Sequence, residues 1–145
     1  MKVFLDTNVL LDLLSTTERP SSEAARIIFQ AIRSGYIEGV LTTQSIVDAN
    51  YILSRLGQGF SAEAFAKAIL SLINFVNISG LNSFDLREAL LHPTGDFEDD
   101  VQFAHAEAEG CDVFLTSDQG LLKRTSEIGM QILPPTQFVA RMTAR

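Results

Sequence analysis

The chain has 145 residues, 46% of them apolar, which is enough for one core, and we expect a single domain over residues 1–145. Eighteen acidic residues against eleven basic ones give a net charge of -7 and a pI near 4.7, which excludes a broad basic surface that wraps nucleic acid. One cysteine excludes an intramolecular disulfide, and two histidines beside it are too few for the usual set of about four structural zinc ligands.

The sequence contains no pattern typical of a membrane span or of export. Its longest mostly apolar stretch, residues 68–76, is about half of the ~20 residues needed to cross a bilayer. The N-terminal segment reaches Asp6 before the apolar region of a signal peptide could form. We therefore expect no membrane contact and a reducing, cytoplasmic location.

Short apolar runs alternate with helical apolar patterns along the chain. Residues 2–5 contain the β-branched and aromatic residues typical of a strand and lead to Asp6, a favourable helix cap. Further strands are expected at 37–41, 76–79, 113–115 and 130–133. Helices are expected from Asp6 to Leu14 and at 21–33, 42–56, 61–75, 82–91, 96–110, 119–122 and 136–142. This alternation, without hairpin signals, predicts an α/β fold in which helices cover both faces of a mainly parallel sheet.

The helix expected after residue 42 has a broad apolar side that includes Val47 and Tyr51, so we expect this side to be buried. The glycines at 57 and 59 are expected to end this helix. The aromatic residues are expected to lie mostly in the core. Cys111 is expected to be a small packing residue.

Four acidic residues are expected to meet at one edge of the sheet. In a parallel sheet, function sits beyond the carboxyl ends of the strands. Asp6 and Asp118 follow two predicted strands, and Asp99 or Asp100 begins the helix before the second of these. Asp48 lies in the helix that follows the strand at 37–41.

Converging carboxylates repel one another unless a divalent cation neutralises them. Mg²⁺ or Mn²⁺ suits a site whose ligands are all oxygen, and such an ion usually keeps several bound waters. A cation held in this way can activate water and stabilise charge on a phosphoryl group, which is what the hydrolysis of a phosphodiester requires. This chemistry needs no serine or cysteine nucleophile.

Three segments together resemble the PIN-domain ribonucleases of the VapC-like toxin type. They are the opening FLDTNVL at 4–10, the block DFED at 96–99 continued by Gln102, Ala106 and Gly110, and TSD at 116–118. The resemblance covers nearly the whole chain in order and spacing. It implies an α/β/α sandwich, cleavage of RNA that depends on Mg²⁺ or Mn²⁺, frequent formation of a homodimer, and an antitoxin partner.

The resemblance also assigns residues, position by position. The family aspartates fall on Asp6, Asp99 and Asp118, with Asn8, Thr116 and Ser117 as a supporting polar shell. Asp99 is chosen over Asp100 because Ala106 and Gly110 then occupy the small positions that follow it. The family usually has a glutamate in the helix after the second strand, where this chain offers Asp48. The segment around Asp48 resembles a subgroup in which that glutamate is often missing, so reduced or altered catalysis is an open alternative.

Each of these residues also has a purely structural interpretation. Asp6 and Asp118 are both placed to cap helices, and the neighbouring acids Asp96, Glu98 and Asp100 fit helix-dipole partners or a solvated acidic face. His92 and His105 are expected to be structural or exposed, without a recognisable partner for triad chemistry. Scattered basic residues near predicted loops and helix ends are candidates for phosphate contacts or simply aid solubility: Arg19, Arg55, Lys123 and Arg124.

Three functions remain in competition. The leading hypothesis is a metal-dependent endoribonuclease in which Asp6, Asp48, Asp99 and Asp118 surround the ion. A phosphatase with an aspartyl-phosphate intermediate is disfavoured, because Asn8 stands where its second acid is needed and no lysine follows Asp118 before Lys123. The third hypothesis is a catalytically weakened PIN-like module that binds RNA or a partner. The apolar helices at 21–33 and 61–75 offer a groove for a homodimer or an antitoxin.

Overall fold

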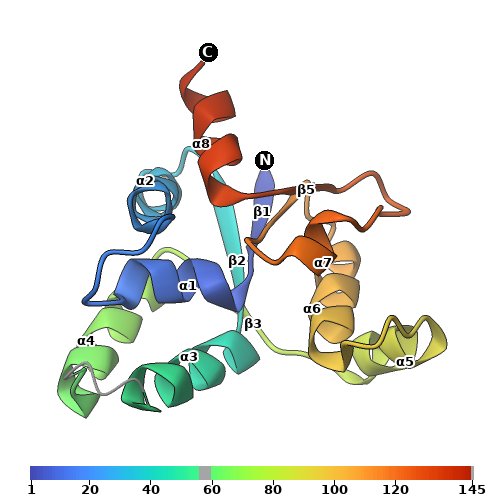
Figure 1. Ribbon diagram of the computed structural model, residues 1–145, viewed down its shortest axis with the longest axis horizontal. Helices are drawn as coiled ribbons and strands as arrows, with labels where there is room; N and C mark the ends of the chain where they lie inside the picture. Colours follow the sequence, from blue (N-terminus) through green and yellow to red (C-terminus); the bar gives the residue numbers. More distant parts are fainter. Residues whose placement is uncertain (56–59, 145) are drawn as a thin grey trace.

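The computed structural model describes residues 1–55 and 60–144, and its centre is one five-stranded sheet (Figure 1). The strands are β1 (Lys2–Leu5), β2 (Glu38–Thr42), β3 (Asn77–Ser79), β4 (Val113–Leu115) and β5 (Gln131–Leu133). They lie in the order β3-β2-β1-β4-β5, and every neighbouring pair is parallel. The predicted parallel sheet is therefore confirmed.

Helices cover both faces of this sheet. In chain order they are α1 (Thr7–Leu14), α2 (Ser22–Arg33), α3 (Thr43–Arg55), α4 (Ala62–Ile73), α5 (Ser83–Leu91), α6 (Phe97–Ala108), α7 (Gln119–Leu122) and α8 (Pro135–Thr143). Figure 1 shows α1 to α4 and α8 on one side of the strands and α5, α6 and α7 on the other. This is the expected three-layer sandwich. Within the described residues, no helix combines the length and the apolar character that crossing a membrane requires.

The alternation of side chains along β1 explains the two cores. Val3 and Leu5 point to one face, where they pack in a cluster with apolar residues of α1, α2 and α8. Phe4 points to the other face and stacks on Phe114 of β4, with 4.8 Å between the ring centroids. These side chains are fully buried, as expected for a parallel strand that is covered on both faces.

Several boundaries differ from the prediction by one or two residues. The helix expected to reach Phe75 ends at Ile73, because Asn74 caps it through backbone hydrogen bonds. The closing helix begins at Pro135 instead of Thr136, since the fixed φ angle of proline suits the first helical position. The expected end of α3 at Gly57 lies outside the described residues.

The outer side of α3 departs from the prediction in a more informative way. Val47 is 63% exposed and Tyr51 is 58% exposed, so the apolar side of this helix is not buried as expected. The fully buried residues of this helix form a narrower stripe of Ser45, Ala49 and Leu53, and Ile46 and Ile52 pack against the core while partly exposed. The prediction was wrong because α3 covers the sheet with one stripe, while its apolar composition suggested a broad buried face.

The strand order creates a crevice beside β1. From β1 the chain proceeds to β2 and β3 on one side, and then to β4 and β5 on the other, so the direction of the connections reverses at β1. Leu5 is paired with Leu115 across β1 and β4, and the next backbone N–H, that of Asp6, donates to the carbonyl of Leu115 at 3.1 Å. The residues after both strands therefore emerge side by side at the reversal, where ligands bind in open α/β sheets.

Candidate functional site

Asp6 lies at the centre of this crevice and is held by two hydrogen bonds. Its Oδ1 accepts from the backbone N–H of Thr7 at 2.8 Å, which makes it the cap of α1, and its Oδ2 accepts from the Thr116 hydroxyl at 2.8 Å. The side chain is almost fully buried, and burial is the main reason that its pKa is raised, with the charges of Asp118 and Asp96 contributing further. Asp6 therefore caps α1, and its surroundings disfavour the charged form of its carboxyl group.

The first turn of α6 brings three more carboxylates to the crevice. Asp96 caps the helix by accepting from the backbone N–H of Asp99 at 3.1 Å. Asp99 is partly buried, and burial followed by the charges of Asp6, Asp96 and Asp118 raises its pKa to about 7. These mutual effects on pKa show that the side chains are close enough to repel one another.

Asp48 faces Glu98 across the pocket. Gln44, one turn earlier on α3, donates to Asp48 Oδ1 at 2.9 Å. The other oxygen, Oδ2, is buried, and no donor among the described residues reaches it. The pKa of Glu98 is raised to about 7, mainly by its hydrogen bond with Asp48, then by burial and by the charge of Asp48. The Glu98 carboxyl group therefore takes up a proton more readily than an isolated glutamate.

Asp118 reaches the same crevice from the carboxyl end of β4. Its backbone N–H donates to the Thr116 hydroxyl at 3.0 Å, and its Oδ1 accepts from the backbone N–H of Leu121 at 2.9 Å. The expected capping role for the short helix α7 is therefore confirmed. Because Thr116 contacts both Asp6 and Asp118, it links the two strand-end carboxylates.

A buried polar network lies behind these acids and fixes α3 against α6. The hydroxyls of Thr7 and Ser45 are 2.8 Å apart, and Thr42 contacts both Ser45 and Gln102 at 3.1 Å. Gln102 also donates to Ser45 at 3.1 Å. Buried networks whose members are satisfied in this way favour one arrangement of the elements that they join.

The acids line one pocket of about 320 Å³. Its lining is Asp6, Thr7, Asn8, Asp48, Tyr51, Ile52, Asp96, Glu98, Asp99 and Asp118. None of these described lining residues is Lys or Arg, so the negative charge of the pocket is not compensated from its own walls. The site-residue predictions for Asp6, Asp48, Asp99 and Asp118 thus fall in one place.

This donor set fits a hard divalent cation by its chemistry. The acidic side chains that face one another all end in oxygen, and one buried oxygen of Asp48 lacks a donor among the described residues. Burial, followed by repulsion from neighbouring acids, raises the pKa values of Asp6 and Asp99. In the described parts of the chain, however, no three Asp, Glu, His or Cys side chains stand close enough together to hold a metal ion as they are placed. Binding an ion here requires the carboxylates to draw together.

The expected polar shell is only partly present. Thr116 supports Asp6 directly, and Asn8 lines the pocket. Ser117 is exposed and is not part of the pocket lining. Sequence reasoning interpreted Asp96 and Glu98 as dipole partners or a solvated face, yet both line the pocket. The run of acids at 96–100 was the available signal, but it does not say which members turn inward.

Asp100 is not part of the pocket lining, unlike its neighbours Glu98 and Asp99. It is buried and pairs with the guanidinium of Arg124 and the hydroxyl of Thr94, so it is not part of a solvated face. Burial alone would raise the pKa of Asp100, but the bonds from Thr94 and Arg124 outweigh burial and lower it. Arg124, a candidate for phosphate contacts, is engaged in this pair, and Arg19 likewise pairs with Asp12 at 2.9 Å.

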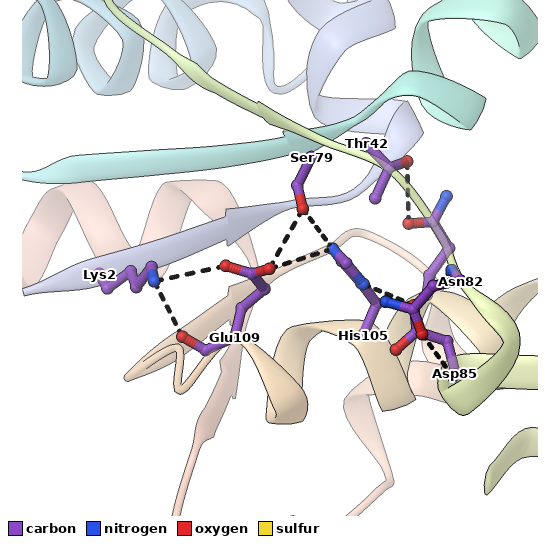
Figure 2. Close-up of polar contacts among 8 residues, drawn as sticks. Lys2, Thr42, Ser79, Asn82, Asp85, His105 and Glu109 are labelled. Carbon is purple, nitrogen blue, oxygen red and sulfur yellow. Dashed lines mark hydrogen bonds and ion pairs between the residues drawn. The ribbon is translucent and has the colours of Figure 1, made fainter.

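His105 has partners that its sequence context did not reveal (Figure 2). Its Nδ1 lies 2.7 Å from Asp85 Oδ2 and its Nε2 lies 2.8 Å from the hydroxyl of Ser79. The imidazole is only 2% exposed, so the expected structural role fits better than triad chemistry. Figure 2 also shows Glu109 between Ser79 and Lys2, which extends the network to β1.

Comparisons with known proteins agree on the fold. A family model described as "PIN domain" matches residues 2–120. Mycobacterium tuberculosis VapC20, named as a sarcin-ricin loop cleaving toxin, superposes with a TM-score of 0.63 at 16% identity and covers 81% of this chain and 90% of its own. PAE2754 from Pyrobaculum aerophilum gives a TM-score of 0.65 at 20% identity, covering 100% of this chain and 91% of its own. FitAcB from Neisseria gonorrhoeae gives 0.54 at 15%, with 92% and 98% covered. A search of curated protein sequences gives no significant match.

Proposed function

Because this chain belongs to the PIN domain family, we propose that it is a metal-dependent endoribonuclease of the VapC-like toxin type. The observation that supports this proposal most is the pocket itself. Six carboxylates from β1, α3, α6 and the end of β4 line it, and no basic residue does among those that are described. Uncompensated, repelling carboxylates at the carboxyl edge of a parallel sheet are costly for stability, which favours a functional role. VapC20, which shares the fold, is named as a sarcin-ricin loop cleaving toxin.

The chain's own residues divide the work in this proposal. Asp6, Asp99 and Asp118, with Asp48 on the opposite wall, would hold Mg²⁺ or Mn²⁺. When bound, such an ion supplies an activated water and neutralises phosphoryl charge. Thr116 and the N–H of Thr7 keep the Asp6 carboxylate in one orientation. Glu98 and Asp48 both line the pocket, and we propose that they share the place of the missing family glutamate.

We further propose an antitoxin as partner. A groove of about 410 Å³ runs between α1, α2 and α4 and is lined by Leu13, Leu14, Phe29, Leu72 and Phe75 among others. An amphipathic segment with apolar side chains at helical spacing would fit such a groove. The exposed side of α5, which carries Phe84, Leu90 and Leu91, is the surface that we propose for a homodimer in the cytoplasm.

The decisive experiment is cleavage of a mixed, structured RNA by the purified protein with EDTA, Mg²⁺ or Mn²⁺. Asp6→Asn and Asp99→Asn are prepared identically, and Glu23→Gln on the exposed start of α2 serves as a matched control for loss of one charge. We expect cleavage only with a metal, a loss of roughly 100-fold or more in the two pocket variants, and no loss in the control.

The alternative is a weakened PIN-like module that works by binding. It would be favoured if folded wild type and both pocket variants were equally inactive with every metal. Titration calorimetry with Mn²⁺ then separates the cases, because a defined stoichiometry that Asp6→Asn abolishes identifies a metal site even without cleavage.

A further inference from the structure

One stripe of α3 continues from the acidic pocket onto the open surface. Asp48, Tyr51, Ile52 and Arg55 are spaced at three- and four-residue steps, so they follow one another on the same side of the helix. The first three line the pocket. The guanidinium of Arg55 lies over the ring of Tyr51, with 4.6 Å between its central carbon and the ring centroid. The stripe therefore leads from a carboxylate through an aromatic ring to a cation.

The exposure of Tyr51 sets it apart from aromatic rings that only pack. Phe4 and Phe114 are fully buried, whereas Tyr51 is 58% exposed. The Arg55 guanidinium lies over one face of the ring, and more than half of the Tyr51 surface is nevertheless exposed. A large ring at the mouth of a polar pocket offers a flat surface to a ligand.

Charge identifies the kind of ligand that fits beside this ring. A phosphodiester that enters the pocket meets six carboxylates, and none of the described lining residues supplies a positive charge. Arg19 and Arg124 are engaged by buried Asp12 and Asp100. Arg55 has no carboxylate partner among the described residues, so its charge is available at the pocket mouth.

We propose that Tyr51 and Arg55 form a platform for an unpaired nucleotide of the RNA substrate, with the base stacked on the open face of Tyr51 and its phosphate on Arg55. The proposal rests on the proposed ribonuclease function and adds a substrate-binding subsite to it. Aromatic rings bind bases of any identity, and Arg adds a cation next to the stack. The subsite therefore selects single-stranded over paired RNA, because a base inside a helix has no free face.

The chain offers a direct readout because it has two tyrosines and no tryptophan. In an Asp6→Asn background, which prevents cleavage, Tyr36→Phe leaves Tyr51 as the only tyrosine and Tyr51→Phe leaves Tyr36. Tyr36 is equally exposed, at 60%, but lies before β2 at the opposite edge of the sheet. Adding a short single-stranded oligoribonucleotide should quench the emission of Tyr51 and leave that of Tyr36 unchanged after the same optical correction.

Affinity measurements sharpen the test. Tyr51→Leu should weaken binding of the oligoribonucleotide about tenfold, Tyr51→Phe should keep it within about twofold, and Tyr36→Leu should leave it unchanged. Arg55→Met should reduce the slope of log affinity against log salt concentration by about 0.7, the value for one lost phosphate contact on a single strand. Circular dichroism and urea unfolding check that each variant is folded, which the exposure of both tyrosines leads us to expect.

The outcomes separate this subsite from the ribonuclease function. Metal-dependent cleavage whose KM is unaffected by Tyr51→Leu overturns the platform and leaves the nuclease. Single-stranded RNA binding that depends on Tyr51, in a wild type that cleaves nothing, supports the platform and removes the nuclease. Failure of the wild type to bind single-stranded RNA overturns the platform. So does a Tyr51→Leu variant with an altered sedimentation coefficient and unchanged RNA binding, because the ring then belongs to a protein interface.

Discussion

Helix α6 has carboxylates around both of its ends, and the partners of these carboxylates differ. At the first turn, Glu98 and Asp99 face other acids in the pocket and have pKa values raised to about 7. Towards the last turn, His105 pairs with Asp85 and Glu109 lies 3.5 Å from Lys2 (Figure 2). The acids near the last turn therefore have basic partners, whereas Glu98 and Asp99 in the first turn face only other acids, and Asp100 in that same turn pairs with Arg124.

This difference separates the acids that have a basic partner from the candidate site acids better than burial does. Asp85 and Asp100 are as buried as Asp6, but they have His105 and Arg124 as partners and connect elements of the fold. Among the described residues, Asp6 has hydrogen-bond partners and no cationic partner. A protein keeps buried or crowded charges without counterions where function requires them, at a cost in stability. Substitutions in the acid–base pairs and substitutions of the pocket acids should therefore change stability in opposite directions.

The largest effect is expected for the pair of His105 and Asp85, near the end of α6. His105→Ala removes the partner of fully buried Asp85 and opens a cavity between α5 and α6, so the free energy of unfolding should fall by about 3 kcal/mol or more. Urea unfolding monitored by circular dichroism measures this change. Glu109→Gln, at the partly exposed margin of the same network, should cost less than about 1 kcal/mol. Equal costs for both variants would contradict the assignment of Asp85 and His105 as the central pair.

The pair of Asp100 and Arg124 should give the next largest effect. Arg124→Met leaves a buried carboxylate without its cation, and we expect a loss of about 2 kcal/mol in the free energy of unfolding. Adding Asp100→Asn to this variant should recover part of the loss, because the remaining charge is then removed. A double variant that is no more stable than Arg124→Met alone would show that the guanidinium acts by packing on Phe103.

Substitution of a pocket acid should change the stability in the opposite direction. Asp99→Asn removes one of several repelling charges, so the metal-free protein at pH 7 should become more stable by about 0.5 kcal/mol, a small value because Asp99 is partly solvated. Thermal unfolding with EDTA measures it. Excess Mn²⁺ should raise the melting temperature of the wild type and not that of the variant. A destabilising Asp99→Asn would place Asp99 with the structural acids.

The smallest effect is expected in the pH dependence of stability, which differs in sign between Asp99 and Asp100, two neighbours in the first turn of α6. The pKa of Asp99 is about 7 in the fold and near its ordinary value of 3.8 when unfolded, so the fold binds the proton more tightly. Its contribution is present at low pH and is lost as the pH rises from about 4 to 7. Asp100, with a lowered pKa, loses its contribution as the pH falls below about 4. Urea unfolding at a series of pH values with EDTA should show the first loss in the wild type and a flatter curve for Asp99→Asn.

Local patterns in the sequence were sufficient for the elements and for two of the site residues. The short apolar runs predicted all five strands to within one residue at each end. The central strands β1 and β4 are covered on both faces and are therefore largely apolar, whereas the edge strands β3 and β5 contain polar residues. Asp6 and Asp118 were found because each follows a strand directly, and the carboxyl ends of parallel strands share one edge. The spacing of Asp99, Ala106 and Gly110 carried the family resemblance that the domain match now supports.

The tertiary structure alone decided which way the side chains of the acidic run turn. Asp96, Glu98 and Asp99 face the pocket, whereas Asp100 turns to Arg124, which is 24 residues away in the chain. Likewise, His105 acquires Asp85 and Ser79 as partners only when α5 and β3 come to rest against α6. The periodicity of apolar residues indicates which side of a helix is apolar, but not how much of that side the neighbouring elements cover. For this reason Tyr51 was expected in the core, whereas it is exposed at the mouth of the pocket.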